Sequence, residues 1–512
     1  MTASVDREGQ GADREAALHP RRPPPVVGWE RLLLPFDRKG PAHVQLMRAL
    51  IEALERGDLP AGVRLPSGRD LARMLGIGRN TALAALSALV DQGYLVSKER
   101  SGVFVADRPP APAKRPQLQD KSSAPDWRRR FTFDDVEERE DGDRQAGCAH
   151  SFLYGQFDAS LFPVAAWREC ERAALSKLEI ARWGRDMIDE DDVDLVEELR
   201  KHVLPYYGIW ARQDEILITL GGQQGRYLVA QLLSGRGTIA GMENPGMPDM
   251  AKVLRMTGAE IRHLAVDEQG LVTSQALYTC DTVYVTTDHQ NPTTATMPIA
   301  RRYELLAQAA AHDFVLVEDT FETEFVSQMA TLPSLKGMEG GNRVVHVGSL
   351  SKLMAPGLRL GYVVAPPLVI SRLRALRRLI HRHPPGNNQR ALAIFIRHGH
   401  YRTYQRRAAL ELDRRSKALG SALNRWLPDF RWRHRGGTST FWIELPNGLN
   451  NRELAANAAR HGVLITSGDR YFHDGSQPTK FIRLSVSTID EAQIDAAVRL
   501  LATARGEAQS AG

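Results

Sequence analysis

The sequence predicts an α/β protein of two parts: a small helical unit with two short strands, then a larger unit built around a mostly parallel sheet. Three observations support this prediction. Apolar residues recur at helical spacing up to about residue 92, strand-like and helix-like segments alternate after about residue 151, and a stretch rich in Pro, Lys and Ser separates the two. The chain has 512 residues, too many for one ordinary domain.

The composition is that of an ordinary soluble protein, with 43% hydrophobic and 25% charged residues. No apolar run reaches the roughly 20 residues that a membrane helix needs, and the N-terminal segment lacks the apolar core of a signal peptide. Three cysteines lie far apart and show no metal-type spacing (Cys148, Cys170 and Cys280). We therefore expect a reduced, cytoplasmic protein without a membrane partner. The net charge of +6 permits nucleic-acid binding but does not show it.

Composition divides the chain into four segments. Residues 1–27 are polar and Pro-rich and are expected to be a disordered tail. Residues 28–107 form a first domain, and residues 108–150 a linker whose prolines favour a semi-extended spacer. Residues 151–505 form the second domain, which past Arg431 has the pattern of a smaller α+β lobe.

The first domain begins with a helix, because Leu46, Leu50 and Leu54 follow at four-residue spacing and share one face. A short second helix starts after Ser67, which resembles a capping box together with Asp70. The glycines of Gly76-Ile77-Gly78 then make a tight turn into a third helix over residues 79–92. We expect the apolar side chains of this helix to face the core (Leu83, Leu86, Leu89 and Val90).

Two strands, "YLVS" and "GVFVA", flank the turn "KERS" and complete a helix-turn-helix with a β-wing. Arg79, Asn80 and Thr81 lie at the exposed start of the third helix, which can enter a major groove. Lys98 and Arg100 on the wing can reach phosphates. On this pattern alone, a small helical domain with a solvated charged face is the alternative.

The run from "LPSGRDLARMLGIGRNT" to "GYLVSKERSGVFVA" resembles the winged helix-turn-helix of GntR-type bacterial regulators. The resemblance implies that Arg69 and Arg79 contact DNA. It also implies that Asn80 and Thr81 contact phosphate or base edges.

In the second domain, Lys352 follows an apolar strand and stands among groups that bind anions. A lysine that forms a Schiff base must be partly desolvated and close to groups that stabilise an aldehyde cofactor. Ser349, Ser351 and Arg359 offer hydroxyl and guanidinium contacts to a phosphate. Pyridoxal 5'-phosphate (PLP), which carries an aldehyde, a pyridine nitrogen and a phosphate, is a cofactor that Lys352 and these groups would suit.

Two other segments offer the remaining contacts. Asp319 ends the strand-like run "FVLVED", where its carboxylate can keep the pyridine nitrogen of PLP protonated. Gly221-Gly222-Gln223 lies between a strand and a helix, so its N–H groups can cradle the phosphate. Each piece alone has an ordinary explanation, as a surface lysine, a helix cap or a turn. Their order along the chain makes the set specific.

That order is a Gly loop, then "DHQNPT", "VED" and "GSLSK" with an arginine seven residues on, and it resembles the fold-type I aminotransferases. The resemblance covers nearly the whole second domain. It implies that Asn291 touches the phenolic oxygen of PLP and that Arg483 binds a substrate or effector carboxylate. It also implies a homodimer. Joined to a GntR-type reader, the architecture resembles the MocR regulators, in which an aminotransferase-like domain senses an amino compound or PLP itself.

Three positions depart from the aminotransferase pattern. Met247 stands where an aromatic residue often stacks on the cofactor ring. Phe321 stands where a tyrosine usually bonds the phenolic oxygen, which leaves Asn291 for that contact. "PTTA" replaces Pro-Thr-Gly, so the loop after Pro292 is less permissive. Neutral drift and weakened transamination both fit these changes.

We therefore expect a PLP-dependent transcriptional regulator that binds DNA, senses an amino compound or PLP, and has weak or no transaminase activity. The alternatives are an active aminotransferase with an accessory DNA-binding domain, and a DNA-binding protein whose second domain only dimerises. A dimer would suit a paired operator. The stretch "HRHPPGNNQRALAIFIRHGHYRTYQRR" is either a solvated helical face or part of an anionic effector site or DNA path.

Overall fold

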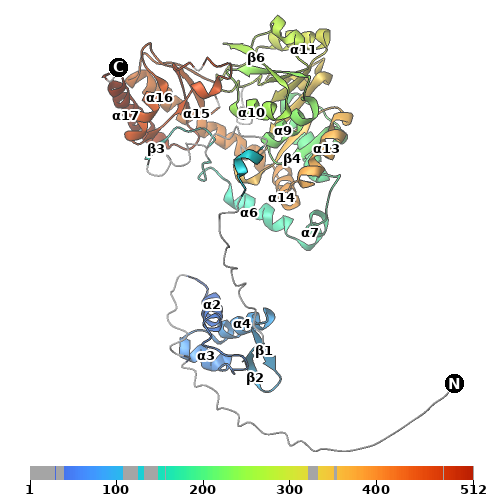
Figure 1. Cartoon of the computed structure of the whole chain (residues 1–512), viewed down its shortest axis with the longest axis vertical. Helices are drawn as coiled ribbons and strands as arrows, with labels where there is room; N and C mark the ends of the chain where they lie inside the picture. Colours follow the sequence, from blue (N-terminus) through green and yellow to red (C-terminus); the bar gives the residue numbers. More distant parts are fainter. Residues whose placement is uncertain are drawn as a thin grey trace, which may run out of the picture. The chain divides into compact units, whose positions relative to one another are not determined.

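A computed structural model of the chain describes residues 29, 40–107, 125–131, 148–155, 157–320, 332–350, 354–436, 438–476 and 478–510 (Figure 1). The chain divides into two units at Phe131. The expected tail and most of the expected linker lie outside the described residues, as do Lys352, Ser351 and Phe321. No described helix combines the length and apolar character needed to span a membrane.

The first unit is a three-helix domain with a β-hairpin. Its elements are α2 (Ala42–Glu55), α3 (Gly68–Leu75), α4 (Arg79–Asp91), β1 (Leu95–Lys98) and β2 (Gly102–Val105), with a 3-10 turn η2 (Trp127–Arg130) further on. Ser67 caps α3 as predicted, because its hydroxyl accepts the Asp70 N–H at 3.2 Å. Gly76 ends α3 with φ 63, in the left-handed region that glycine adopts without strain. The helix-turn-helix and the wing are thus present as predicted.

The core of this unit corrects one sequence expectation. Leu46 and Leu50 are fully buried as predicted, but Leu83 is 44% exposed. The buried positions of α4 are Ala82, Ala85, Leu86 and Leu89. Leu83 lies one step around the helix from them and covers the bare backbone of Gly68, where an added Cβ would meet Leu83 Cδ2 at 2.8 Å.

An eight-stranded sheet organises the second unit, in the order β4-β11-β10-β9-β8-β5-β6-β7. The strands are β4 (Ile216–Thr219), β5 (Ile239–Asn244), β6 (Glu260–Asp267), β7 (Gly270–Leu271), β8 (Thr282–Val285), β9 (Val315–Asp319), β10 (Val344–Ser349) and β11 (Gly361–Val364). Strands β10, β9, β8, β5 and β6 are parallel to their neighbours in this run. Strand β11 is antiparallel to β10 and β4, and β7 is antiparallel to β6. The sheet is therefore mostly parallel, as expected.

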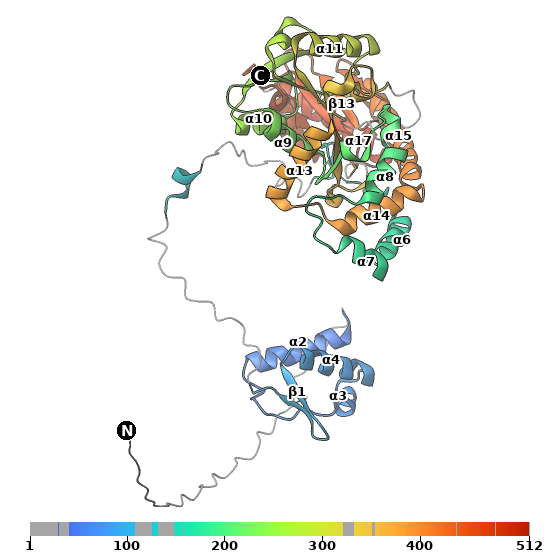
Figure 2. The same ribbon diagram turned by 90° about the vertical axis from the view of Figure 1, so that its right-hand side faces the viewer.

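Helices cover both faces of this sheet because its strands are apolar on both faces. In β4, Leu217 packs into one cluster while Ile216 and Ile218 pack into the opposite one. The Leu217 face is covered by α9 (Gly222–Leu233), α10 (Pro248–Thr257) and α13 (Pro367–His381). The opposite face is covered by α8 (Val193–His202), α11 (Ile299–His312) and α14 (Gly386–Arg397) (Figure 2).

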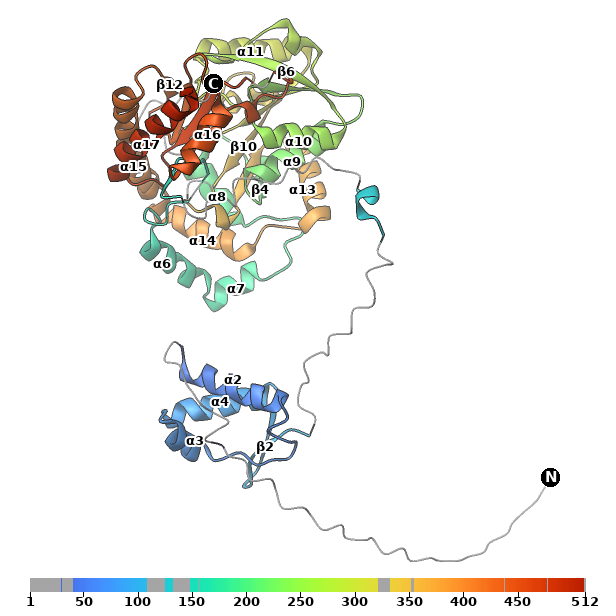
Figure 3. The ribbon, with the colours of Figure 1, turned by 60° about the vertical axis from the view of Figure 1, so that its left-hand side comes forward.

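A second sheet, β12-β13-β16-β15, forms the C-terminal lobe. Its strands are β12 (Arg431–His434), β13 (Thr440–Glu444), β15 (Thr466–Ser467) and β16 (Phe481–Ser485), and β14 (Val463–Leu464) pairs separately with β3 (His150–Ser151). The packing helices are α15 (His400–Trp426), α16 (Asn451–Arg460) and α17 (Glu491–Ser510) (Figure 3). Helix α15 joins the lobes, because Tyr401 and Ala408 pack in the core under the large sheet while Leu412 and Leu419 pack in the core of the C-terminal lobe.

The segment rich in His and Arg does not form a solvated helical face along α14. This helix packs against α6 (Val164–Ala174), α7 (Lys177–Trp183) and α8, and its residues 389–396 are buried. Arg390 is 4% exposed and forms ion pairs with Glu179, Asp192 and Asp194. The arginine charge is thus neutralised inside the protein, which the sequence pattern did not indicate.

Candidate functional site

Five loops of the large sheet meet at the carboxyl ends of its parallel strands, where α/β proteins bind ligands. Asp319 is the last residue of β9 and Ser349 the last residue of β10. Asn291 lies in the loop after β8, and Met247 is the N-cap of α10 after β5. Gly222 begins α9 directly after β4. The sheet topology therefore brings these predicted residues to one edge.

One group at this edge has the composition of an anion site. The Arg359 guanidinium donates to the Leu220 carbonyl at 2.6 Å, and its Nη2 would lie 3.1 Å from a Cβ on Gly221, whose φ is 82. A Cβ on Gly222 would lie 3.6 Å from the Ser349 Cβ. The first N–H groups of α9, which begins at Gly222, have no acceptor within the helix. A hydroxyl, a guanidinium and a helix N-terminus together suit a phosphate.

Arg226 joins this group and was not predicted from the sequence. Its Nη1 donates to Asp319 Oδ2 at 2.8 Å, and its Nη2 donates to Gln223 Oε1 at 2.7 Å. The two charged side chains are 14% and 12% exposed. Burial raises the pKa of Asp319, although the Arg226 charge opposes that rise. Arg226 stands four residues after Gly222 on α9, so the two residues share one face of the helix. This spacing is the sequence signal that could have indicated Arg226 as part of the site.

Asn291 and Glu243 are both buried at this edge of the sheet, and the charge of Asp319 acts on the Glu243 carboxyl. The Asn291 side-chain oxygen has no hydrogen-bond partner among the described residues, and the residue is 4% exposed. Glu243 Oε2 accepts from Thr286 Oγ1 at 2.6 Å and from Gln290 Nε2 at 3.2 Å. Burial raises the pKa of Glu243 to about 8 against these hydrogen bonds, and the Asp319 charge adds to the rise. A neutral Glu243 keeps a second negative charge away from Asp319.

The "PTTA" loop shows why a glycine is usual there. Thr294 adopts φ 62, in the left-handed region that a β-branched residue rarely occupies. The turn is closed by hydrogen bonds from Thr294 N to Gln290 O at 2.8 Å and from Gln290 N to Ala295 O at 2.9 Å. The chain therefore keeps the glycine-type backbone with a strained residue, next to Asn291.

Arg483 lies on β16 in the C-terminal lobe and is 2% exposed. It donates to the Tyr471 hydroxyl at 2.9 Å and to Thr440 Oγ1 at 3.1 Å, and its guanidinium lies 3.8 Å from the centroid of the Tyr154 ring. The Tyr471 carbonyl in turn accepts the Gly246 N–H at 2.9 Å, in the loop that leads to α10. This chain of contacts connects Arg483 to the edge of the large sheet.

Three predicted residues of this site, Lys352, Ser351 and Phe321, lie outside the described residues, so their places stay predictions. The described residues fit PLP on three counts. They offer a phosphate cradle at α9, a carboxylate for the ring nitrogen, and the buried Asn291 amide, whose NH2 group is a hydrogen-bond donor for the phenolic oxygen.

The predicted DNA-contacting residues lie on the surface of the first unit. Arg69, Arg79 and Asn80 are exposed, and Thr81 is half-buried. Within residues 40–107, neither Arg69 nor Arg79 forms an ion pair. On the wing, Lys98 and Arg100 are exposed, and Lys98 Nζ lies 5.0 Å from the centroid of the Phe104 ring. The start of α4 and the hairpin thus both carry basic side chains that phosphates can approach.

Two family models match the chain. Residues 43–105 match the bacterial regulatory proteins of the gntR family, and residues 162–501 match the class I and II aminotransferases. The HTH-type transcriptional regulator TauR of Rhodobacter capsulatus is 38% identical over 477 residues, which cover 93% of this chain and 99% of TauR. The probable rhizopine catabolism regulatory protein MocR of Rhizobium meliloti is 28% identical over 404 residues, which cover 78% of this chain and 80% of MocR.

Among solved structures, the chain is similar to LysN, the alpha-aminoadipate aminotransferase of Thermus thermophilus, complexed with N-(5'-phosphopyridoxyl)-L-leucine. The TM-score is 0.67 at 26% identity, and the match covers 74% of this chain and 97% of LysN. The aminotransferase fold and this ligand imply PLP binding. With a GntR winged helix-turn-helix ahead of a fold-type I aminotransferase domain, and full-length similarity to HTH-type regulators, the chain belongs to the MocR-type subfamily of GntR transcriptional regulators.

Proposed function

We propose that this DNA-binding regulator holds PLP through Lys352 and uses it to sense a small primary amine. The observation that supports the proposal best is the convergence of Gly222, Ser349 and Arg359 with Asp319 at one sheet edge. An anion cradle and a buried carboxylate at such an edge are the contacts that the phosphate and the pyridine nitrogen of PLP require.

When bound, PLP supplies an aldehyde that condenses reversibly with primary amines. The N–H groups of α9, the Ser349 hydroxyl and the Arg359 guanidinium would hold its phosphate. Asp319 would hold a proton on the ring nitrogen, and Asn291 would donate to the phenolic oxygen. Lys352 would be the amine that anchors the cofactor, and an effector amine would compete with it for the aldehyde.

The effector would also carry a negative group, because Arg483 is a buried cation reached from the same edge through Tyr471. An effector bound to Arg483 would contact the C-terminal lobe. We expect a movement of that lobe to be the signal that reaches the DNA-binding unit. A homodimer would present two such units to a paired operator. Met247 and the strained "PTTA" loop favour sensing over rapid transamination.

The test compares Lys352→Ala with Lys336→Ala, a matched change at another lysine, which is partly buried. Wild type and Lys336→Ala should be yellow, and borohydride should fix PLP on the peptide that contains Lys352. Operator affinity, measured by gel shift with and without small amino acids, should respond to the amine in both proteins. Lys352→Ala should keep its basal affinity but lose the response.

The same experiment separates the alternatives. An aminotransferase with an accessory reader would turn over an amino acid and a keto acid, and Lys352→Ala would abolish only that turnover. If the second domain only dimerises, Lys352→Ala would change neither turnover nor the amine response. An unchanged amine response in PLP-free Lys352→Ala protein would exclude the sensing mechanism.

A further inference from the structure

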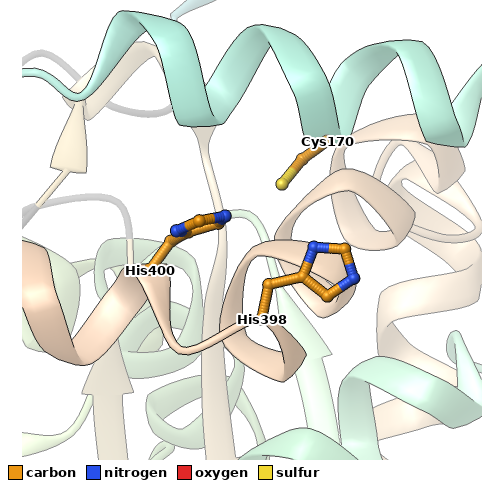
Figure 4. Close-up of side chains that lie close together, drawn as sticks. All are labelled: Cys170, His398 and His400. Carbon is orange, nitrogen blue, oxygen red and sulfur yellow. The ribbon is translucent and has the colours of Figure 1, made fainter.

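Cys170, His398 and His400 come together although they lie on separate helices, and none of them is among the residues assigned to PLP. Cys170 belongs to α6, His398 caps the end of α14, and His400 is the first residue of α15. Figure 4 shows the Cys170 sulfur pointing from α6 toward the two imidazole rings. One ligand atom of each residue lies within 4.8 Å of the other two.

The backbone explains how two histidines reach one thiol. Gly399 separates them with φ 77, in the left-handed region, so α14 and α15 meet at a sharp corner. Helix α6 packs against α14 along this corner. Among the described residues, neither histidine ring makes a hydrogen bond to another side chain. The His400 ring packs 5.4 Å from the Phe395 ring, centroid to centroid.

A thiolate with two imidazoles is a donor set for zinc and similar transition-metal ions. Zn–S bonds of about 2.3 Å and Zn–N bonds of about 2.0 Å hold ligand atoms roughly 3.5 Å apart in a tetrahedral site. The ligand atoms lie within 4.8 Å of one another, so binding would bring them closer by roughly 1 Å. Exposure rises from the fully buried Cys170 through the half-buried His400 to the exposed His398, so an ion can enter from solvent and keep a water as fourth ligand.

We propose that Cys170, His398 and His400 form a zinc-type metal site that ties α6 to the corner between α14 and α15. Binding replaces the thiol proton, which leaves to solvent, with a metal–sulfur bond. Glu169 and Glu171 flank Cys170 in the sequence, and the charges of both carboxylates act on the thiol.

The site lies where one helix connects two lobes. Helix α15 begins at His400 under the large sheet and continues into the C-terminal lobe. A metal ion at its first residue would fix the start of this connecting helix. The proposal does not depend on PLP binding, because none of its ligands belongs to the PLP site.

The test is a cobalt titration of the full-length, reduced and chelator-treated protein. Cobalt(II) reports thiolate ligation by a charge-transfer band and tetrahedral geometry by visible d–d bands at wavelengths longer than those PLP absorbs. The wild type should bind one cobalt per chain with both signals, and zinc should displace it. Cys170→Ala should lose the charge-transfer band and at least tenfold in affinity.

Two further variants keep the test decisive. Cys280→Ala changes another buried cysteine and should titrate like the wild type. His398→Gln changes an exposed position, so it should fold normally and still lose at least tenfold in cobalt affinity. A wild-type titration without the charge-transfer band would overturn the proposal. So would a band that survives in Cys170→Ala.

Discussion

Replacing Glu243 by glutamine tests the electrostatics of the candidate PLP site directly. Glu243 is 5% exposed, and its Oε2 accepts hydrogen bonds from Thr286 and Gln290. Glutamine keeps a carbonyl oxygen for these donors and nearly the same shape. The substitution therefore removes little except the ability to ionise.

The magnitude follows from the pKa difference between the folded and the unfolded chain. Burial raises the pKa of Glu243 to about 8, from an ordinary value of 4.5. Because the folded value is the higher one, the carboxyl's contribution to stability is complete below pH 4.5 and is lost as the pH rises to about 8. Each pH unit in that window costs about 1.4 kcal/mol, so the wild type should lose about 3 kcal/mol between roughly pH 5.5 and 8. Glu243→Gln should not lose it.

Thermal unfolding of both proteins across this pH range measures the effect. An unfolding entropy of about 2 cal/mol/K per residue means that a unit of roughly 380 residues shifts its Tm by about 1 °C per kcal/mol. The Tm advantage of Glu243→Gln should therefore grow by about 4 °C from roughly pH 5.5 to 8 and then level off. Glu304→Gln, at an exposed site on α11, controls for the loss of a carboxylate. A Tm gap that stays constant with pH would refute a buried, neutral Glu243.

Three other outcomes are expected. Arg226→Leu leaves the largely buried Asp319 without its ion-pair partner. This should lower the free energy of unfolding by about 3–5 kcal/mol when the carboxylate is charged. Denaturant unfolding should therefore show a larger loss of stability at pH 8 than at pH 5. An equal loss of stability at both pH values would contradict the role of the ion pair. Arg79→Ala should weaken operator binding by about 1–3 kcal/mol. Lys98→Ala should weaken DNA binding less, and by a similar amount for every DNA sequence. Gel-shift titration checks both, and intact operator affinity in Arg79→Ala would mean that α4 is not the reading helix. Thr294→Gly should raise stability by about 1 kcal/mol by relieving the left-handed strain. A lower denaturation midpoint instead would mean that the threonine contacts outweigh that strain.

Much of the fold was predictable because its signals are local. The N-cap hydrogen bond of Ser67 with Asp70 joins residues three apart, and the hairpin of β1 and β2 follows from two short apolar runs around a polar turn. The alternating strands and helices likewise predicted a mostly parallel sheet. Since such strands end at one edge, the sequence alone also placed Asp319 and Ser349 together.

The sequence failed where orientation around a helix decided the outcome. Leu83 matched the apolar pattern but lies one step off the buried face of α4. The arginines of α14 fitted a solvated helical face, yet Arg390 is buried because acidic residues of α7 and the start of α8 surround it. A pattern of residue types does not reveal which partners will neutralise a charge.

By itself, then, the sequence determined the order of the elements and the two-domain architecture, because periodicity and turn chemistry act over a few residues. Only the tertiary structure decided the pairing of Arg226 with Asp319, 93 residues apart, the burial that keeps Glu243 neutral, and the meeting of Cys170 with His398 and His400. The physical reason is that charge pairing, desolvation and ligand clustering depend on distances in space. Strand order and helix packing set those distances, and no local spacing in the chain encodes them.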